Sequence, residues 1–195
     1  MQQTSKPGRV RRIGAIAVAA VLTIFGVVAI AQGLTGRSTV HRALQQEAIV
    51  GLPYMTPTAI APKAKEAGLR DVTLPTCSVA GKPVEDAATA RCFAEYMRID
   101  ALMVTGGATY SKLPPYATKD GKGTSHPARA QHGPDGKPVT NPSVDVWVTE
   151  TALSTALNTS YMAEQISLFG IAVGVAFLLV GVVFGVVATA GRRNP

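Results

Sequence analysis

The chain has 195 residues, of which 47% are apolar, and it carries a formal net charge of +7. Residues 1–12 hold four basic and no acidic residues and residues 191–195 hold two basic residues, whereas residues 32–165 hold thirteen basic and twelve acidic residues. A nucleic-acid-binding protein gathers its basic residues on a folded face, so this distribution excludes nucleic acid as a predicted partner.

The first predicted element is a transmembrane helix over residues 13–31, "IGAIAVAAVLTIFGVVAIA", after a basic tail at residues 1–12. The segment is uncharged and long enough to cross a hydrocarbon core of about 30 Å at 1.5 Å per residue. The alternative is a cleaved signal peptide, because "AIA" at 29–31 fits a cleavage site. The apolar run exceeds the usual length of a signal core, so we favour a retained anchor.

Three short helices are predicted in the first part of the central segment, residues 32–165. After a break at Gly33 and Gly36, a short helix is expected over 38–51, and "MTPTAIAPKAKEAGL" predicts a helix that begins at a proline and stops at Gly68. The third helix begins near Asp86 and ends at "GG", residues 106–107. It has apolar residues on two opposite sides, which indicates that it is packed on both and forms the centre of this segment. One side comprises Ala90, Ala94, Met97, Ala101 and Val104, and the other comprises Cys92, Tyr96, Ile99 and Met103.

The only two cysteines are Cys77 and Cys92. In an exported segment the default for such a pair is a disulfide, which by loop entropy stabilises the fold by roughly 3 kcal/mol for a loop of this length. Their spacing matches no zinc-ligand pattern, so we predict no metal here.

Residues 111–142 are rich in Pro, Gly and Lys and predict a long extended loop. Two of the three histidines, His126 and His132, lie in it, and the third is His41. Because the spacing matches no standard ligand set and the loop offers nothing rigid, we predict no metal site and no cofactor.

From about Val146 a last helix is predicted to lead without interruption into a second transmembrane segment over residues 166–190, followed by a basic tail at 191–195. Trp147 lies too far above that segment for a headgroup belt and is predicted to pack in the exported domain. Basic residues at both outer ends predict that both termini are cytoplasmic in the plasma membrane, with 32–165 on the other side.

Small residues form a stripe along each transmembrane segment. In lipid, close backbone approach along such stripes supplies much of the attraction between helices, so we predict a packing groove that receives the first segment or a second copy. The stripe residues are Gly170, Gly174, Gly181 and Gly185 in the second segment, and Ala15, Ala19 and Gly26 in the first. Glycine is also simply common in membrane helices, which is the alternative explanation.

The predicted fold is therefore mostly α-helical, with two transmembrane helices flanking an extracytoplasmic helical domain. The stretches "ALQQEAIVGLPYMTP", "AGKPVEDAATARCFAEYMRIDAL", "TGGATYSKLP" and "VWVTETALSTALNTSYMAEQISLFG" resemble small two-span membrane proteins of actinobacteria of unknown function. Some relatives carry the label aromatic ring-opening dioxygenase. That activity would need Fe(II) on two histidines and a carboxylate, for which this sequence shows no rigid set.

The sequence shows no catalytic constellation, so we expect a non-catalytic membrane protein whose exported domain binds or supports another envelope component. The expected partners are the lipid bilayer and a membrane protein or a second copy of the chain. An oligomeric transport pore is the alternative, which the lack of ionisable residues in both transmembrane segments disfavours. A subunit related to the dioxygenases is a remote alternative.

Overall fold

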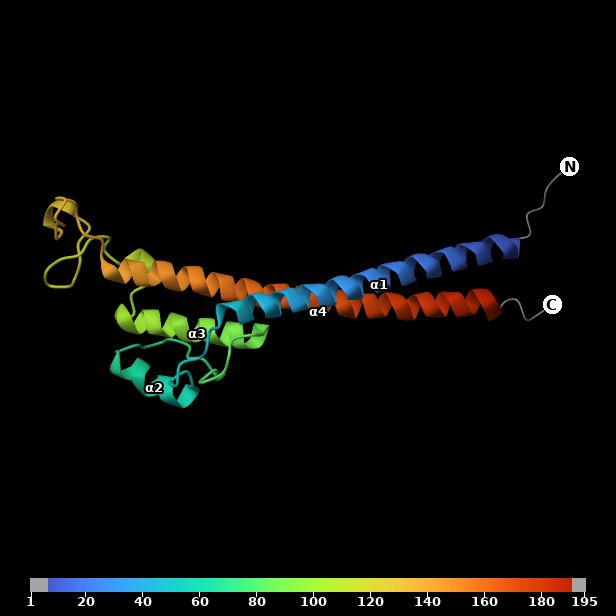
Figure 1. Ribbon diagram of the computed structural model, residues 1–195, viewed down its shortest axis with the longest axis horizontal. Coiled ribbons are helices and arrows are strands. Elements are labelled where there is room, and N and C mark those ends of the chain that lie inside the picture. Colours follow the sequence, from blue (N-terminus) through green and yellow to red (C-terminus); the bar gives the residue numbers. More distant parts are fainter. Residues whose placement is uncertain (1–6, 191–195) are drawn as a thin grey trace. The chain divides into compact units, whose positions relative to one another are not determined.

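The computed structural model describes residues 7–190 and contains four α-helices. Two are long, α1 (Pro7–Glu47) and α4 (Pro142–Ala190), and two are short, α2 (Pro57–Glu66) and α3 (Ala87–Val104), as Figure 1 shows. Within the described part of the chain there is no β-strand. By length and composition, both α1 and α4 could cross a membrane. The prediction of a mostly helical fold with two long apolar helices is therefore confirmed.

The described chain divides into two compact units. The first contains residues up to 41 and from 163 onward, and the second contains residues 42–162. The apolar parts of α1 and α4 make up the first unit. The remainder of both helices, together with α2 and α3, belongs to the second, and each unit is described separately below.

The predicted break at Gly33 and Gly36 is wrong, because α1 continues through both glycines to Glu47. Ser38, the first residue of the short helix expected over 38–51, lies inside α1, and its hydroxyl donates to the Thr35 carbonyl oxygen one turn earlier at 2.9 Å. Glycine weakens a helix by about 1 kcal/mol relative to alanine, but it also allows another helix to approach closely. Here a Cβ on Gly33 would lie 2.6 Å from the Ser167 carbonyl oxygen, so close packing against α4 accounts for the glycine.

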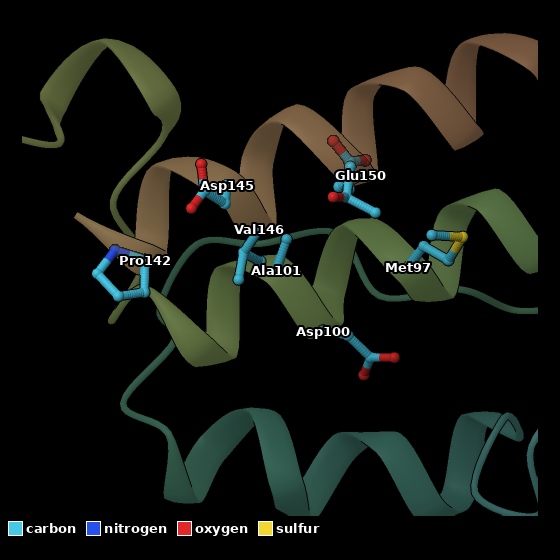
Figure 2. A pocket seen from close by; sticks show the side chains of 8 residues that line it. Met97, Asp100, Ala101, Pro142, Asp145, Val146 and Glu150 are labelled. Carbon is cyan, nitrogen blue, oxygen red and sulfur yellow. The ribbon is translucent and has the colours of Figure 1, made fainter. Parts of the chain in front are cut away.

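In the second unit, α3 lies between α2 and the first turns of α4 (Figures 1 and 2). Its start matches the prediction, because the Asp86 side chain accepts from the Thr89 backbone N–H at 2.8 Å. In return, the Thr89 hydroxyl oxygen accepts from the Asp86 backbone N–H at 3.2 Å. This reciprocal cap satisfies N–H groups that a helix start leaves without partners. The helix ends before Gly106 and Gly107, both of which adopt positive φ.

Both sides of α3 are packed as predicted. The core of the unit forms around fully buried Tyr96, and it also contains Met55, Ile60, Ala64, Val79, Cys92, Ile99, Ala101, Leu102 and Trp147. Val104 departs from the prediction, since this last residue of α3 is 66% exposed. Trp147 packs in this core, and its indole Nε1 donates to the Ala108 carbonyl oxygen at 2.9 Å.

The segment between α3 and α4 contains two short 3₁₀ turns, Tyr110–Lys112 and Pro127–Arg129. Isolated bridges fold it back on itself, since Tyr116 pairs with both Thr124 and Thr140. Asn141 closes the segment, because its side-chain amide donates to the Pro114 carbonyl oxygen at 2.9 Å.

Candidate functional site

The two cysteines are joined in the second unit at an S–S distance of 2.02 Å and a Cα–Cα distance of 6.0 Å. Cys92 lies on α3, and Cys77 lies on the preceding segment. The Tyr96 hydroxyl donates to the Cys77 carbonyl oxygen at 2.7 Å, so a hydrogen bond holds the same segment one helical turn away from the disulfide. The predicted pair is therefore at bonding distance, and it fixes the chain before α3 onto the core.

In the first unit, the apolar parts of α1 and α4 run antiparallel and meet along small residues. A Cβ on Gly174 would lie 2.7 Å from the Gly26 carbonyl oxygen, and one on Gly26 would lie 2.8 Å from the Gly174 carbonyl oxygen. Further along, a Cβ on Gly181 would lie 3.2 Å from the Ala19 carbonyl oxygen. Two of the predicted stripe residues, Gly26 and Gly174, are thus at positions where the two backbones approach too closely for a side chain, and Gly181 is at a tight contact with Ala19.

The remaining stripe residues are less tightly placed. A Cβ on Gly170 would lie 3.8 Å from the Ala29 carbonyl oxygen, which is an ordinary van der Waals contact. Ala15 is half-buried. Gly185 departs from the predicted groove, because a Cβ there would meet no atom within 4 Å. Gly33, which was predicted to break the helix, is instead a further point of close contact between α1 and α4. It lies toward the end of the helix pair that contains Ser167.

An ionic cluster lies at that end of the helix pair. The Glu164 side chain is only 5% exposed, and its Oε1 accepts from Arg37 Nε at 2.9 Å and lies 3.4 Å from His41 Nε2. A buried carboxylate is costly without a hydrogen-bonded cation, so Arg37 offsets the burial of Glu164. Sequence reasoning missed this cluster because its members are 123 and 127 residues apart.

Three carboxylates of the second unit line a groove of about 420 Å³ between α3 and α4: Asp100, Asp145 and Glu150. Figure 2 shows that they do not converge, since Asp100 projects from α3 toward α2. There it accepts from the Tyr54 hydroxyl at 2.7 Å. Burial raises the pKa of Asp100, while the Tyr54 bond and nearby Lys63 lower it. The pKa of Tyr54 is raised by its own burial and by the Asp100 carboxylate.

The side chains that could ligate a metal are dispersed in the described part of the chain. Across residues 7–190, no three His, Cys, Asp or Glu side chains are placed to hold a metal ion. His126 and His132 lie in the segment between α3 and α4, where His132 forms a bridge with Pro138 through the backbone.

A second and larger cleft, of about 590 Å³, is also lined by residues of α3 and α4. Two arginines of α3 line this cleft, and each lies over an aromatic ring of α4. Arg91 Cζ lies 4.9 Å from the Tyr161 ring centroid, and Arg98 Cζ lies 5.4 Å from that of Trp147. The opposite wall is polar, with Thr151, Ser154, Thr155 and Asn158. We call this feature the arginine cleft.

Glu150 lines the arginine cleft and is only 5% exposed. Its carboxylate accepts from the Ser154 hydroxyl at 2.9 Å and from the Thr151 hydroxyl at 3.3 Å. In the sequence, Arg91, Glu95 and Arg98 share one polar strip of α3, a pattern that is typical of a solvent-exposed helix face. This pattern could not show that α4 contributes the second wall.

Fold and site together define a chain with a helical, disulfide-closed unit and two long apolar helices. No family model, curated protein or solved structure matches this chain. Its function is therefore inferred from its own residues.

Proposed function

We propose that this protein is a non-catalytic integral protein of the plasma membrane, with two spans and both termini in the cytoplasm. The segment 32–165 lies outside the cytoplasm and binds or supports another component of the envelope. One observation carries the proposal: the helices that supply the two long apolar stretches also supply walls of the disulfide-closed unit. Leu44 of α1 and Leu157 of α4 are both buried in that unit.

The apolar stretches support a membrane location because they expose large side chains. Phe25 and Phe169 are 61% and 71% exposed, and Ile24, Leu179 and Val187 are similarly open. Exposed apolar surface of this extent is unfavourable in water and ordinary in contact with acyl chains. Backbone hydrogen bonds within each helix satisfy the polar main chain, as a lipid environment requires.

The orientation is supported by charge and by redox chemistry. The basic residues beyond the two apolar stretches match the preference of cytoplasmic flanks for Lys and Arg. The Cys77–Cys92 disulfide suits an oxidising compartment, which is where the same orientation would place it. These two arguments are independent of each other.

A photo-crosslinking experiment in cells tests the binding role. A benzophenone amino acid is introduced singly at Val50, Val104 or Tyr110, which are exposed positions of the second unit. We expect a discrete protein or envelope-polymer adduct from at least one of them. The matched control is Phe169, which should crosslink mainly to lipid. Adducts from Phe169 with none from the second unit would contradict the proposal, because the apolar helices would then carry the interaction.

A further inference from the structure

We propose that the arginine cleft binds a small zwitterionic ligand, in which an ammonium group faces Glu150 and an anionic phosphate or carboxylate faces Arg98. The inference concerns the unit of residues 42–162 alone. It holds on whichever side of a membrane that unit lies, and so does not rest on the function proposed above.

The first observation is a buried carboxylate without a cation. Glu150 is 5% exposed, and its partners are the hydroxyls of Ser154 and Thr151. No ion pair links it to a basic side chain among residues 10–190. Hydroxyl donors satisfy the oxygens but leave the negative charge without compensation, which is costly in a buried position. A ligand ammonium entering the cleft would supply that charge.

The second observation is that Arg98, which lines the same cleft, forms no ion pair with a carboxylate of the described chain. Arg98 lies over the Trp147 ring. Stacking on the ring holds the guanidinium in place while its N–H groups remain available. A guanidinium presents a planar fork of donors that matches phosphate or carboxylate oxygens. Arg91 differs, because its Nε lies 3.4 Å from the Glu95 carboxylate.

Opposite charges on one cleft that do not pair with each other define the ligand class. Arg98 and Glu150 line the same space of about 590 Å³ and are not joined by an ion pair. That volume lies within the range typical of small-molecule sites. A ligand with an ammonium and an anionic group could neutralise both, and the wall of Ser, Thr and Asn side chains could hydrogen-bond its remaining polar atoms. A purely anionic or purely cationic ligand would leave one of the two charges without a partner.

The test is isothermal titration calorimetry on the purified full chain in detergent, with O-phosphoethanolamine as the probe. Inorganic phosphate and ethanolamine, each carrying one of the two charges, serve as comparison ligands. We expect O-phosphoethanolamine to bind at least tenfold more tightly than either. No measurable binding, or equal binding of a single-charge ligand, would overturn the proposal.

Variants assign the two charges. Glu150→Gln and Arg98→Gln should each weaken O-phosphoethanolamine binding at least tenfold, whereas Glu66→Gln, on exposed surface at the end of α2, should change it less than twofold. Because Glu150 is buried, the circular dichroism of its variant is checked first. If that variant does not fold, the exposed Arg98→Gln decides alone, and unchanged binding in it would refute the site.

The ligand could be free or be the headgroup of a lipid. The titration is repeated in nanodiscs that contain or lack phosphatidylethanolamine. Competition by the lipid supports the site and identifies the headgroup as its source. Tight binding that the lipid leaves unchanged supports the site with a free zwitterion as its ligand.

Discussion

Gly174→Ala tests the packing of α1 against α4 because it adds one methyl group at the closest approach. A Cβ there would lie 2.7 Å from both the Gly26 carbonyl oxygen and Ile30 Cγ1. Ordinary contact begins at 3.4 Å, so the helices must separate by about 0.7 Å. A gap of that size forfeits roughly a quarter to a half of the dispersion energy of each affected contact. We expect the clash to cost about 1–3 kcal/mol, the usual range for overpacking.

Gly185→Ala is the matched control. It lies on the same helix and gains the same intrinsic preference of alanine for helix, about 1 kcal/mol, but a Cβ there meets no atom within 4 Å. The difference between the two variants therefore isolates the clash. In thermal unfolding of the full chain in detergent, followed by circular dichroism, Gly174→Ala should unfold about 2–12 °C below Gly185→Ala. Equal unfolding temperatures would refute close packing at Gly174.

Three further predictions concern the folded contacts. Replacing both Cys77 and Cys92 by Ser should lower the free energy of unfolding by roughly 3 kcal/mol in denaturant titrations, and a loss below about 1 kcal/mol would contradict a structural disulfide. Arg37→Gln should lower the free energy of unfolding by about 1–3 kcal/mol, because Glu164 then stays buried with less compensating charge. The double variant Arg37→Gln/Glu164→Gln should recover part of that loss. Strictly additive losses of the two single variants would contradict the ion pair. Burial raises the pKa of Asp100, so protonation of its carboxyl favours the folded state. This contribution to the free energy of unfolding is fully present below the ordinary pKa of about 3.9. It is lost as the pH rises through the raised pKa of the folded state. The wild type should therefore gain stability relative to Asp100→Asn as the pH falls from 6 to 3, and a pH-independent difference would argue against it.

Local signals in the sequence predicted most of the helices. Asp86 before an apolar pattern and the glycine pair after it marked α3, because capping and positive φ are decided by neighbouring residues. For the same reason, Pro57 and Gly68 marked α2. Two-sided burial of α3 also followed from spacing alone, although Val104 at its end is exposed.

Features that depend on distant residues were missed. Gly33 has the signature of a helix breaker when only its neighbours are considered, and its role becomes visible once Ser167 is placed beside it. The partners of Glu164 and the second wall of the arginine cleft are likewise set by which faces of separate helices meet. Spacing within one helix could not reveal either pairing.

Labelling of intact cells with a membrane-impermeant maleimide tests the proposed topology most directly. Lys122→Cys places a thiol on exposed surface between α3 and α4, and Gln3→Cys places one before the first apolar stretch without altering the basic charge there. The native cysteines are joined to each other and should not react. We predict that Lys122→Cys is labelled in intact cells and that Gln3→Cys is labelled only after the membrane is permeabilised. Labelling of Gln3→Cys in intact cells, or protection of Lys122→Cys until permeabilisation, would contradict the proposed topology.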